Sequence, residues 1–260
     1  MKHLSIIRPI AATILLSTIG LGQAVEKKQH FELSTSNINS FSIDSGAGSL
    51  EIKGNSNSNK IRVEAQITVD GVDDDEAEKW FKKHMKLSLV EKNGSAVLTA
   101  KFEDSSSFFS FSWNKTRTID LVVDMPANLA LKVDDGSGDS EVSGLSAKLE
   151  FDDGSGNLKV SDIEGDVYID DGSGSLIIEN ITGNLVVDDG SGNLDVRHVS
   201  GEVDIEDGSG SIDIRQIGSK VYINDGSGSI KACDIDGNLT VDDGSGSLDT
   251  CNIKGEVVVK

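Results

Sequence analysis

The sequence predicts an all-β protein. We expect a parallel β-solenoid with 18-residue coils of two short strands each, and a small N-terminal capping region containing one helix and a hairpin. Two observations predict this fold. The motif Asp-Asp-Gly-Ser-Gly, or a single-residue variant of it, recurs every 18 residues between residues 134 and 246. Aliphatic residues stand at fixed offsets between the motifs, in one frame that runs from Leu129 to Lys260 without insertion or deletion.

Each coil divides into two nine-residue halves, of which residues 156–164 and 165–173 are examples. Positions 3 and 5 are aliphatic in nearly all halves, and position 8 is aliphatic in the first half but glycine in the second. Apolar residues two apart, flanked by polar ones, indicate a strand of about five residues with one buried face. A single coil cannot bury its own aliphatic stripe, so successive coils must stack. An antiparallel meander is the alternative, although it would not require one register throughout.

Residues 1–24 have the pattern of a secretory signal peptide. Lys2 and Arg8 form a charged segment before a short apolar stretch, and Gly22-Gln23-Ala24 fits a cleavage site. The mature chain is then expected to begin near Val25, with no transmembrane segment after cleavage. The apolar stretch is shorter than the roughly 20 residues of a membrane span. An uncleaved signal anchor remains the alternative.

Residues 25–128 are less regular than the repeats and are expected to form the first part of the same solenoid. Residues 41–52 resemble a degraded copy of the repeat. The other predicted elements are a strand over 61–68, an amphipathic helix over 73–86 with Ala77, Trp80, Phe81 and His84 on one face, a hairpin over 87–102 around Asn93-Gly94, and a strand over 119–123. The helix and hairpin are expected to cover the N-terminal end of the stack, as a solenoid cap must.

The net charge of −20 is concentrated in the repeats. Residues 129–260 hold 28 Asp/Glu and 9 Lys/Arg, whereas residues 1–128 hold 16 and 15. A surface of this sign repels a phosphate backbone, which excludes nucleic acid as a partner. It favours cations and basic partners instead.

Acidic residues occupy two adjacent positions of the second half. Position 7 is aspartate in every coil: Asp135, Asp153, Asp171, Asp189, Asp207, Asp225 and Asp243. Position 6 is acidic in six: Asp134, Asp152, Asp170, Asp188, Glu206 and Asp242. One interpretation is a turn device, in which the position-7 carboxylate accepts a hydrogen bond from the backbone two residues on. The other interpretation is metal binding, because stacked coils put the position-7 carboxylates in a row, with the position-6 row beside it. Calcium would bind there weakly, with a dissociation constant of about 10⁻⁴–10⁻³ M.

Two further features are candidate sites. Phe109, Phe111 and Trp113 lie in an aromatic cluster that either packs under the cap or contacts a partner. Cys233 and Cys251 share position 6 of their halves, one coil apart. Their Cα atoms are then expected about 4.8 Å apart, within bridging distance. The spacing predicts a disulfide, with two unpaired thiols as the alternative.

The layout resembles the bacterial "putative adhesin" family of exported β-strand-repeat proteins of unknown function. The resemblance covers roughly residues 40–260 and rests mainly on the run from Ile119 through Pro126 to Val133, followed by the Gly-Ser-Gly repeats. It implies a β-solenoid on an exported protein and supplies no catalytic residues.

We expect no enzymatic activity and no cofactor beyond weakly bound calcium, because His30, His84 and His198 are scattered and no nucleophile has a recognisable setting. The sequence favours an exported binding or adhesion-type module that presents an acidic surface in the periplasm or at the cell surface. Its partner would be an envelope or extracellular protein or glycan. The alternative function is a structural or self-assembling envelope element with calcium-stabilised turns. Residues 255–260 end mid-coil, which predicts weak self-association through the C-terminal coil.

Overall fold

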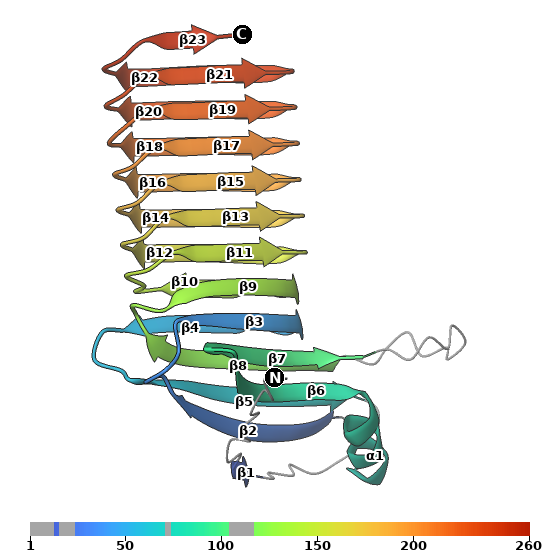
Figure 1. Cartoon of the computed structure of the whole chain (residues 1–260). Coiled ribbons are helices and arrows are strands. Elements are labelled where there is room, and N and C mark those ends of the chain that lie inside the picture. Colours follow the sequence, from blue (N-terminus) through green and yellow to red (C-terminus); the bar gives the residue numbers. More distant parts are fainter. Residues whose placement is uncertain (1–12, 16–23, 71–73, 104–116) are drawn as a thin grey trace, which may run out of the picture.

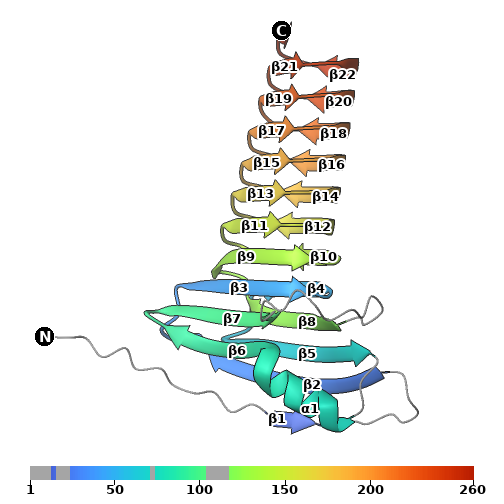
Figure 2. The ribbon, with the colours of Figure 1, turned by 90° about the vertical axis from the view of Figure 1, so that its right-hand side faces the viewer.

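The computed structural model describes residues 13–15, 24–70, 74–103 and 117–260. Two sheets, A with twelve strands and B with eleven, stack as the two faces of one column. Figures 1 and 2 show this column, with the C-terminus at one end and the irregular N-terminal strands at the other. Both sheets run through the repeats and the N-terminal region, so the two parts form a continuous stack.

The repeat region contributes one strand per coil to each sheet. In sheet A the strands are β10 (Ser140–Ser143), β12 (Gly156–Ile163), β14 (Gly174–Ile181), β16 (Gly192–Val199), β18 (Gly210–Ile217), β20 (Gly228–Ile235) and β22 (Gly246–Ile253). In sheet B they are β9 (Ala130–Ser137), β11 (Leu149–Asp153), β13 (Val167–Asp171), β15 (Leu185–Asp189), β17 (Val203–Asp207), β19 (Val221–Asp225), β21 (Leu239–Asp243) and β23 (Val257–Val259).

Neighbouring coils pair in parallel with a register of 18 residues. Leu158 lies beside Leu176 in sheet A, and Val167 lies beside Leu185 in sheet B. This register confirms the parallel solenoid and rules out the antiparallel meander. It also brings aliphatic side chains together, since positions 3, 5 and 8 of the first half, such as Leu176, Ile178 and Ile181, are buried between the sheets.

The sheet A strands are eight residues long from β12 onward, longer than the five residues predicted. The extra length comes from position 7 of the first half, which adopts a left-handed backbone conformation and turns position 8 back into the core. Six non-glycine residues have φ of 54° to 60° there: Asp162, Asn180, His198, Gln216, Asp234 and Asn252. Asp and Asn tolerate this conformation better than other side chains, which explains their frequency at the position.

The glycines of the repeat motif allow the coils to approach closely. Gly192 has a φ of 155°, and a Cβ added there would lie 1.6 Å from the carbonyl oxygen of Gly174 in the preceding coil. No L-residue fits this position, because both its backbone conformation and its neighbour exclude a side chain.

The irregular region forms the layers beneath the repeats. β3 (Ser40–Ala47) and β4 (Leu50–Asn55) pair in parallel with β9 and β10, with Phe41 beside Leu131 and Ile43 beside Val133. Residues 41–52 are therefore a true coil, as predicted. β7 (Ser95–Phe102) and β8 (Arg117–Pro126) form the next layer, although they follow β3 and β4 in the chain. The spatial order of the layers thus differs from the chain order.

The outermost strands at this end run antiparallel. β5 (Lys60–Asp70) pairs with β8, β2 (Ala24–Ser34) pairs with β5, and β1 (Thr13–Leu15) pairs with β2. β6 (Met85–Lys92) forms the predicted hairpin with β7. The hairpin therefore does more than cover the end, because its second strand belongs to the coil stack.

The helix α1 (Asp74–His84) lies at the same end of the column (Figure 2). Phe81 is buried, as its predicted face requires, and the Lys27 ammonium lies 5.8 Å from the centre of its ring. Lys27 also contacts Glu78 at 3.5 Å, which ties the helix to β2. Within the described part of the chain, no helix has the length and hydropathy of a membrane span. Most of the predicted signal peptide lies outside the described residues.

Candidate functional site

The position-7 aspartates, Asp135 to Asp243, point into the core between the two sheets, and we call them the inner row. The first six are 1–5% exposed, and Asp243, in the last full coil, is half-buried. They form the predicted row, with Asp171 beside Asp189, but the prediction that the position-6 acids lie beside this row was wrong. Side chains alternate between the faces of a strand, so positions 3, 5 and 7 all face inward while position 6 faces outward.

Each inner-row carboxylate in the regular coils has one satisfied oxygen. The Oδ1 atoms of Asp153, Asp171, Asp189, Asp207 and Asp225 accept hydrogen bonds from the backbone N–H two residues on, at 2.9–3.1 Å. The turn-device interpretation is therefore correct. The Oδ2 atoms of the same five residues are buried and have no hydrogen-bond partner within the described residues.

Asp135, in the first coil of the run, is different. Its Oδ1 accepts a hydrogen bond from the Ser45 hydroxyl at 2.8 Å, and its Oδ2 accepts one from the Ser140 hydroxyl at 2.9 Å. Ser45 holds the equivalent of position 7 in the β3 coil. Ser140 holds position 3 of β10, the position of Leu158 in the next coil.

Burial, together with repulsion from neighbouring acids, raises the pKa values of the inner-row members from Asp135 to Asp225. Burial is the main cause at Asp153, where the neighbouring Asp135 and Asp171 carboxylates help to raise the pKa to about 7. The same causes raise the pKa values of Asp189 and Asp207 to about 6. Two full charges at the strand spacing of about 4.8 Å repel by about 3.5 kcal/mol at an effective dielectric constant of about 20.

The position-6 acids form a second row, the outer row, on the solvent face of sheet B. Its members are Asp134, Asp152, Asp170, Asp188, Glu206 and Asp242. The first five lie side by side on consecutive strands and are exposed. No lysine or arginine of the described residues lies within salt-bridge distance of the row. Nearby lysines pair elsewhere on the face, for example Lys148 with Glu150 at 2.6 Å.

A hollow of about 280 Å³ interrupts this face beside the outer row. Asp152 and Asp170 line it together with Tyr168, which is 41% exposed. The ammonium group of Lys148 lies 4.3 Å from the centre of the Tyr168 ring. The hollow thus combines an aromatic face with two unpaired carboxylates, a combination suited to a cationic group.

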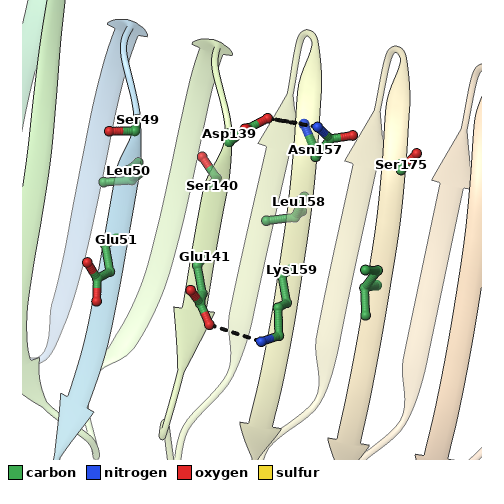
Figure 3. Close-up of a pocket in the computed structure, with 11 residues that line it drawn as sticks. Ser49, Leu50, Glu51, Asp139, Ser140, Glu141, Asn157, Leu158, Lys159 and Ser175 are labelled. Carbon is green, nitrogen blue, oxygen red and sulfur yellow. Dashed lines mark hydrogen bonds and ion pairs between the residues drawn. The ribbon is translucent and has the colours of Figure 1, made fainter.

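Sheet A carries a larger depression, of about 410 Å³, across β4, β10, β12 and β14. In Figure 3, Glu141 points toward Lys159 from the neighbouring strand, and their charged atoms lie 3.2 Å apart. Asn157 donates to Asp139 at 2.9 Å in the same way. These four polar groups of the depression therefore pair with one another, in contrast to the outer row.

A metal site is not supported by this geometry. The described residues contain no group of three or more His, Cys, Asp or Glu side chains placed to hold a metal ion. The carboxylates assigned to calcium are those of the inner row, which the core encloses. We therefore do not identify the inner row as metal ligands, and calcium binding by the chain stays a prediction.

The predicted disulfide is present. Cys233 and Cys251 are bonded, with their Cα atoms 4.6 Å apart on the adjacent strands β20 and β22. Cys233 is buried and Cys251 is exposed, so the bond fastens the last full coil to the one before it. The aromatic cluster of Phe109, Phe111 and Trp113 lies outside the described residues.

Several solved structures resemble this chain at low identity. A "putative cell adhesion protein" from Clostridium sporogenes is 13% identical with a TM-score of 0.33, over 90% of this chain and 99% of that one. A "putative lipid binding protein" from Parabacteroides distasonis is 16% identical with a TM-score of 0.45, over 90% of this chain and 96% of that one. A "putative adhesin" from Bacteroides fragilis is 11% identical with a TM-score of 0.39, over 90% and 97%.

A search of curated proteins finds no relative of this chain. The model of one protein family, described as Toastrack DUF4097, matches residues 38–256. The match begins just before β3, the first coil strand of the chain, and includes every full coil of the repeat. This chain therefore belongs to the Toastrack DUF4097 family.

Proposed function

We propose that this chain is an exported, non-enzymatic binding module that presents the outer row to a basic partner in the cell envelope. The observation that carries the proposal is the outer row itself, with five exposed acids in register and no ion pair to neutralise them among the described residues. Repulsion among these acids is relieved when a partner supplies the missing cations.

The hollow at Tyr168 favours a protein partner with exposed lysine side chains. Lys148 already lies over this ring, which supports its suitability for an ammonium group. A lysine from a partner would meet the unpaired carboxylates of Asp152 and Asp170 beside the same ring. A neutral glycan would leave those charges unpaired, so a basic protein is the better candidate of the two.

Export to the periplasm or the cell surface is supported by two independent features. Residues 1–24 have the charged start, apolar stretch and small-residue site of a signal peptide. The Cys233–Cys251 disulfide requires an oxidising compartment to form and persist.

Calorimetric titration of the full chain with oligolysine tests the proposal. A variant with Asp152→Asn, Asp170→Asn and Asp188→Asn removes three charges from the outer row. Its matched control, Glu141→Gln, Asp195→Asn and Asp213→Asn, removes three charges from sheet A, where Lys159, Arg197 and Arg215 pair with them. We expect the outer-row variant to bind at least about tenfold more weakly, at roughly 0.5 kcal/mol per charge, and the control to lose far less. Equal losses would show that only net charge matters and would contradict the proposal.

A second candidate function, self-assembly through the C-terminal coil, is favoured by the exposure of that coil. Val257 and Val259 are 43% and 57% exposed, and the outer edges of β22 and β23 are unpaired within the described residues. Sedimentation over a range of concentrations tests this function. A sedimentation coefficient that rises with concentration, and stops doing so in a Val257→Lys and Val259→Lys variant, would support it. A monomer at every concentration would contradict it.

A further inference from the structure

The inner row has more buried acceptors than donors. In five consecutive coils, from Asp153 to Asp225, one carboxylate oxygen per residue is buried without a hydrogen-bond partner in the described residues. Buried oxygens of this kind are rare in folded proteins, because each one loses its hydrogen bonds to water. Five such oxygens in consecutive coils indicate that the inner row itself supplies the donors.

For Asp153 to Asp225, the described residues offer no other donor to these oxygens. On the facing strands of sheet A, the place of Ser140 is taken by Leu158, Leu176, Leu194, Ile212 and Ile230. Along the column, the carboxylates from Asp153 to Asp225 have other members of the row as neighbours, as Asp207 has Asp189 and Asp225. On its own strand the neighbouring charge is an outer-row acid, as Asp188 is for Asp189. The charges that act most strongly on these carboxylates are all negative.

We propose that the inner row is a proton-sharing ladder, in which alternate carboxyl groups hold a proton and donate it to a carboxylate of the adjacent coil. One proton for every two members provides each unpartnered oxygen with a hydrogen bond. It also halves the charge that the core must hold, while the Oδ1 atoms keep their backbone donors. The carboxyl oxygen of one coil donates and that of the next accepts, a strong type of hydrogen bond.

The ladder makes the solenoid sensitive to pH in the direction opposite to ordinary acid denaturation. Asp153 has a pKa of about 7 and Asp189 one of about 6, whereas an unfolded aspartate has one of about 3.9. Between about pH 4 and pH 7 the folded chain therefore holds protons that the unfolded chain has released. Stability is greatest at the acidic end of this window and falls as the pH rises through it.

Thermal unfolding of the full chain at pH 5 and pH 8 tests the proposal. We expect the Tm to be at least about 5 °C lower at pH 8, where the shared protons are lost. Asp189→Asn keeps an oxygen that can accept the hydrogen bond from the Ser191 backbone N–H. The asparagine side chain cannot ionise, and its amide group supplies a donor to the next coil. It should raise the Tm at pH 8 and reduce the difference between the two pH values. The matched control Asp188→Asn, one residue away in the outer row, removes only the smallest cause of the raised Asp189 pKa and should reduce that difference much less.

Two further measurements keep the test decisive if Asp189→Asn fails to fold. A difference titration of the unaltered chain, folded against urea-unfolded, should show about two to three protons released on unfolding at pH 6, one for every two of the five members Asp153 to Asp225. Calcium chloride, compared with sodium chloride of equal ionic strength, should not raise the Tm through Asp189. Unfolding without proton release, or a calcium-specific rise in Tm that Asp189→Asn abolishes, would overturn the proposal.

Discussion

Asp135 and Asp189 occupy the same position of the coil, and both are buried, yet their environments differ. Asp135 borders the irregular region and has serine hydroxyls on both carboxylate oxygens. Asp189 lies in the regular repeats and has one backbone donor on Oδ1 and none on Oδ2. The irregular coils thus satisfy a buried charge with side chains, whereas the regular coils repeat a single local turn and leave the second oxygen to the neighbouring aspartates.

This difference follows from stacking identical units. A repeat that places leucine or isoleucine at position 3 gains a continuous apolar core, but it offers no hydroxyl to position 7 in any coil. Ser45 and Ser140 occur only where the repeat gives way to irregular sequence.

The largest expected effect is a steric test of how closely the two regions pack. A Cβ at Gly190 would lie 2.6 Å from the Gly172 carbonyl oxygen, whereas at Gly46, the counterpart of Gly136 in the β3 coil, it would lie 3.1 Å from the Lys101 Cβ. Gly190→Ala should lower the free energy of unfolding by about 3 kcal/mol or more, and Gly46→Ala by less than about 1 kcal/mol. Urea unfolding measures both, and similar losses would contradict the difference in packing.

Removing the disulfide compares the two ends of the column. The N-terminal end is covered by β2, β6 and α1, whereas the C-terminal coil depends on the Cys233–Cys251 bond. A Cys233→Ser and Cys251→Ser variant should lose about 2–3 kcal/mol of stability, the value for closing a loop of this length. Hydrogen exchange should localise the loss to β22 and β23, and an equal loss of protection at β2 would argue against an end effect.

Replacing the two serines should convert Asp135 into an ordinary member of the inner row. A Ser45→Ala and Ser140→Ala variant removes both hydroxyl donors and should cost about 2 kcal/mol at pH 8. The loss should be smaller at pH 5, because the pKa of Asp135 then rises further and a proton replaces the missing donors. The control Ser42→Ala and Ser143→Ala removes outward-facing hydroxyls from the same strands. Chemical unfolding at both pH values measures the two losses. Equal losses of stability in the Ser45/Ser140 variant and in its control would contradict the account.

The smallest expected effect concerns the left-handed position within the repeats. Gln216 has a φ of 60°, where four of the other five non-glycine residues at this position are Asp or Asn. Gln216→Asn should stabilise the chain by about 0.5 kcal/mol, because asparagine adopts this conformation at less cost. Gln216→Ala should give no such gain. A thermal melt separates the two variants, and a gain in both would assign the effect to something other than the backbone.

Much of the fold could be predicted because the repeat is strict. The 18-residue frame determines which residues pair, and the shared position of Cys233 and Cys251 was enough to predict their bond. The layer order at the N-terminal end was not predictable in this way. β3 and β4 are inserted between β7–β8 and the repeats, and that choice depends on long-range pairing that no local pattern encodes.

The sequence identifies the acidic positions but not their orientation. Positions 3 and 5 are aliphatic, so strand alternation already implies that position 7 faces inward. The charge of aspartate made the surface the expected place, because isolated charged side chains are rarely buried. The reason this rule fails here, a row of neighbours able to share protons, becomes visible only once the coils are stacked.

The most direct test of the ladder is an NMR pH titration of the full chain labelled with ¹³C at the aspartate carboxyls. Our account predicts that Asp153 titrates at a pKa of about 7 and that Asp189 and Asp207 titrate at about 6. Titration of all inner-row carboxyls near the ordinary aspartate value of about 3.9 would contradict it, because the core would then hold a file of full charges.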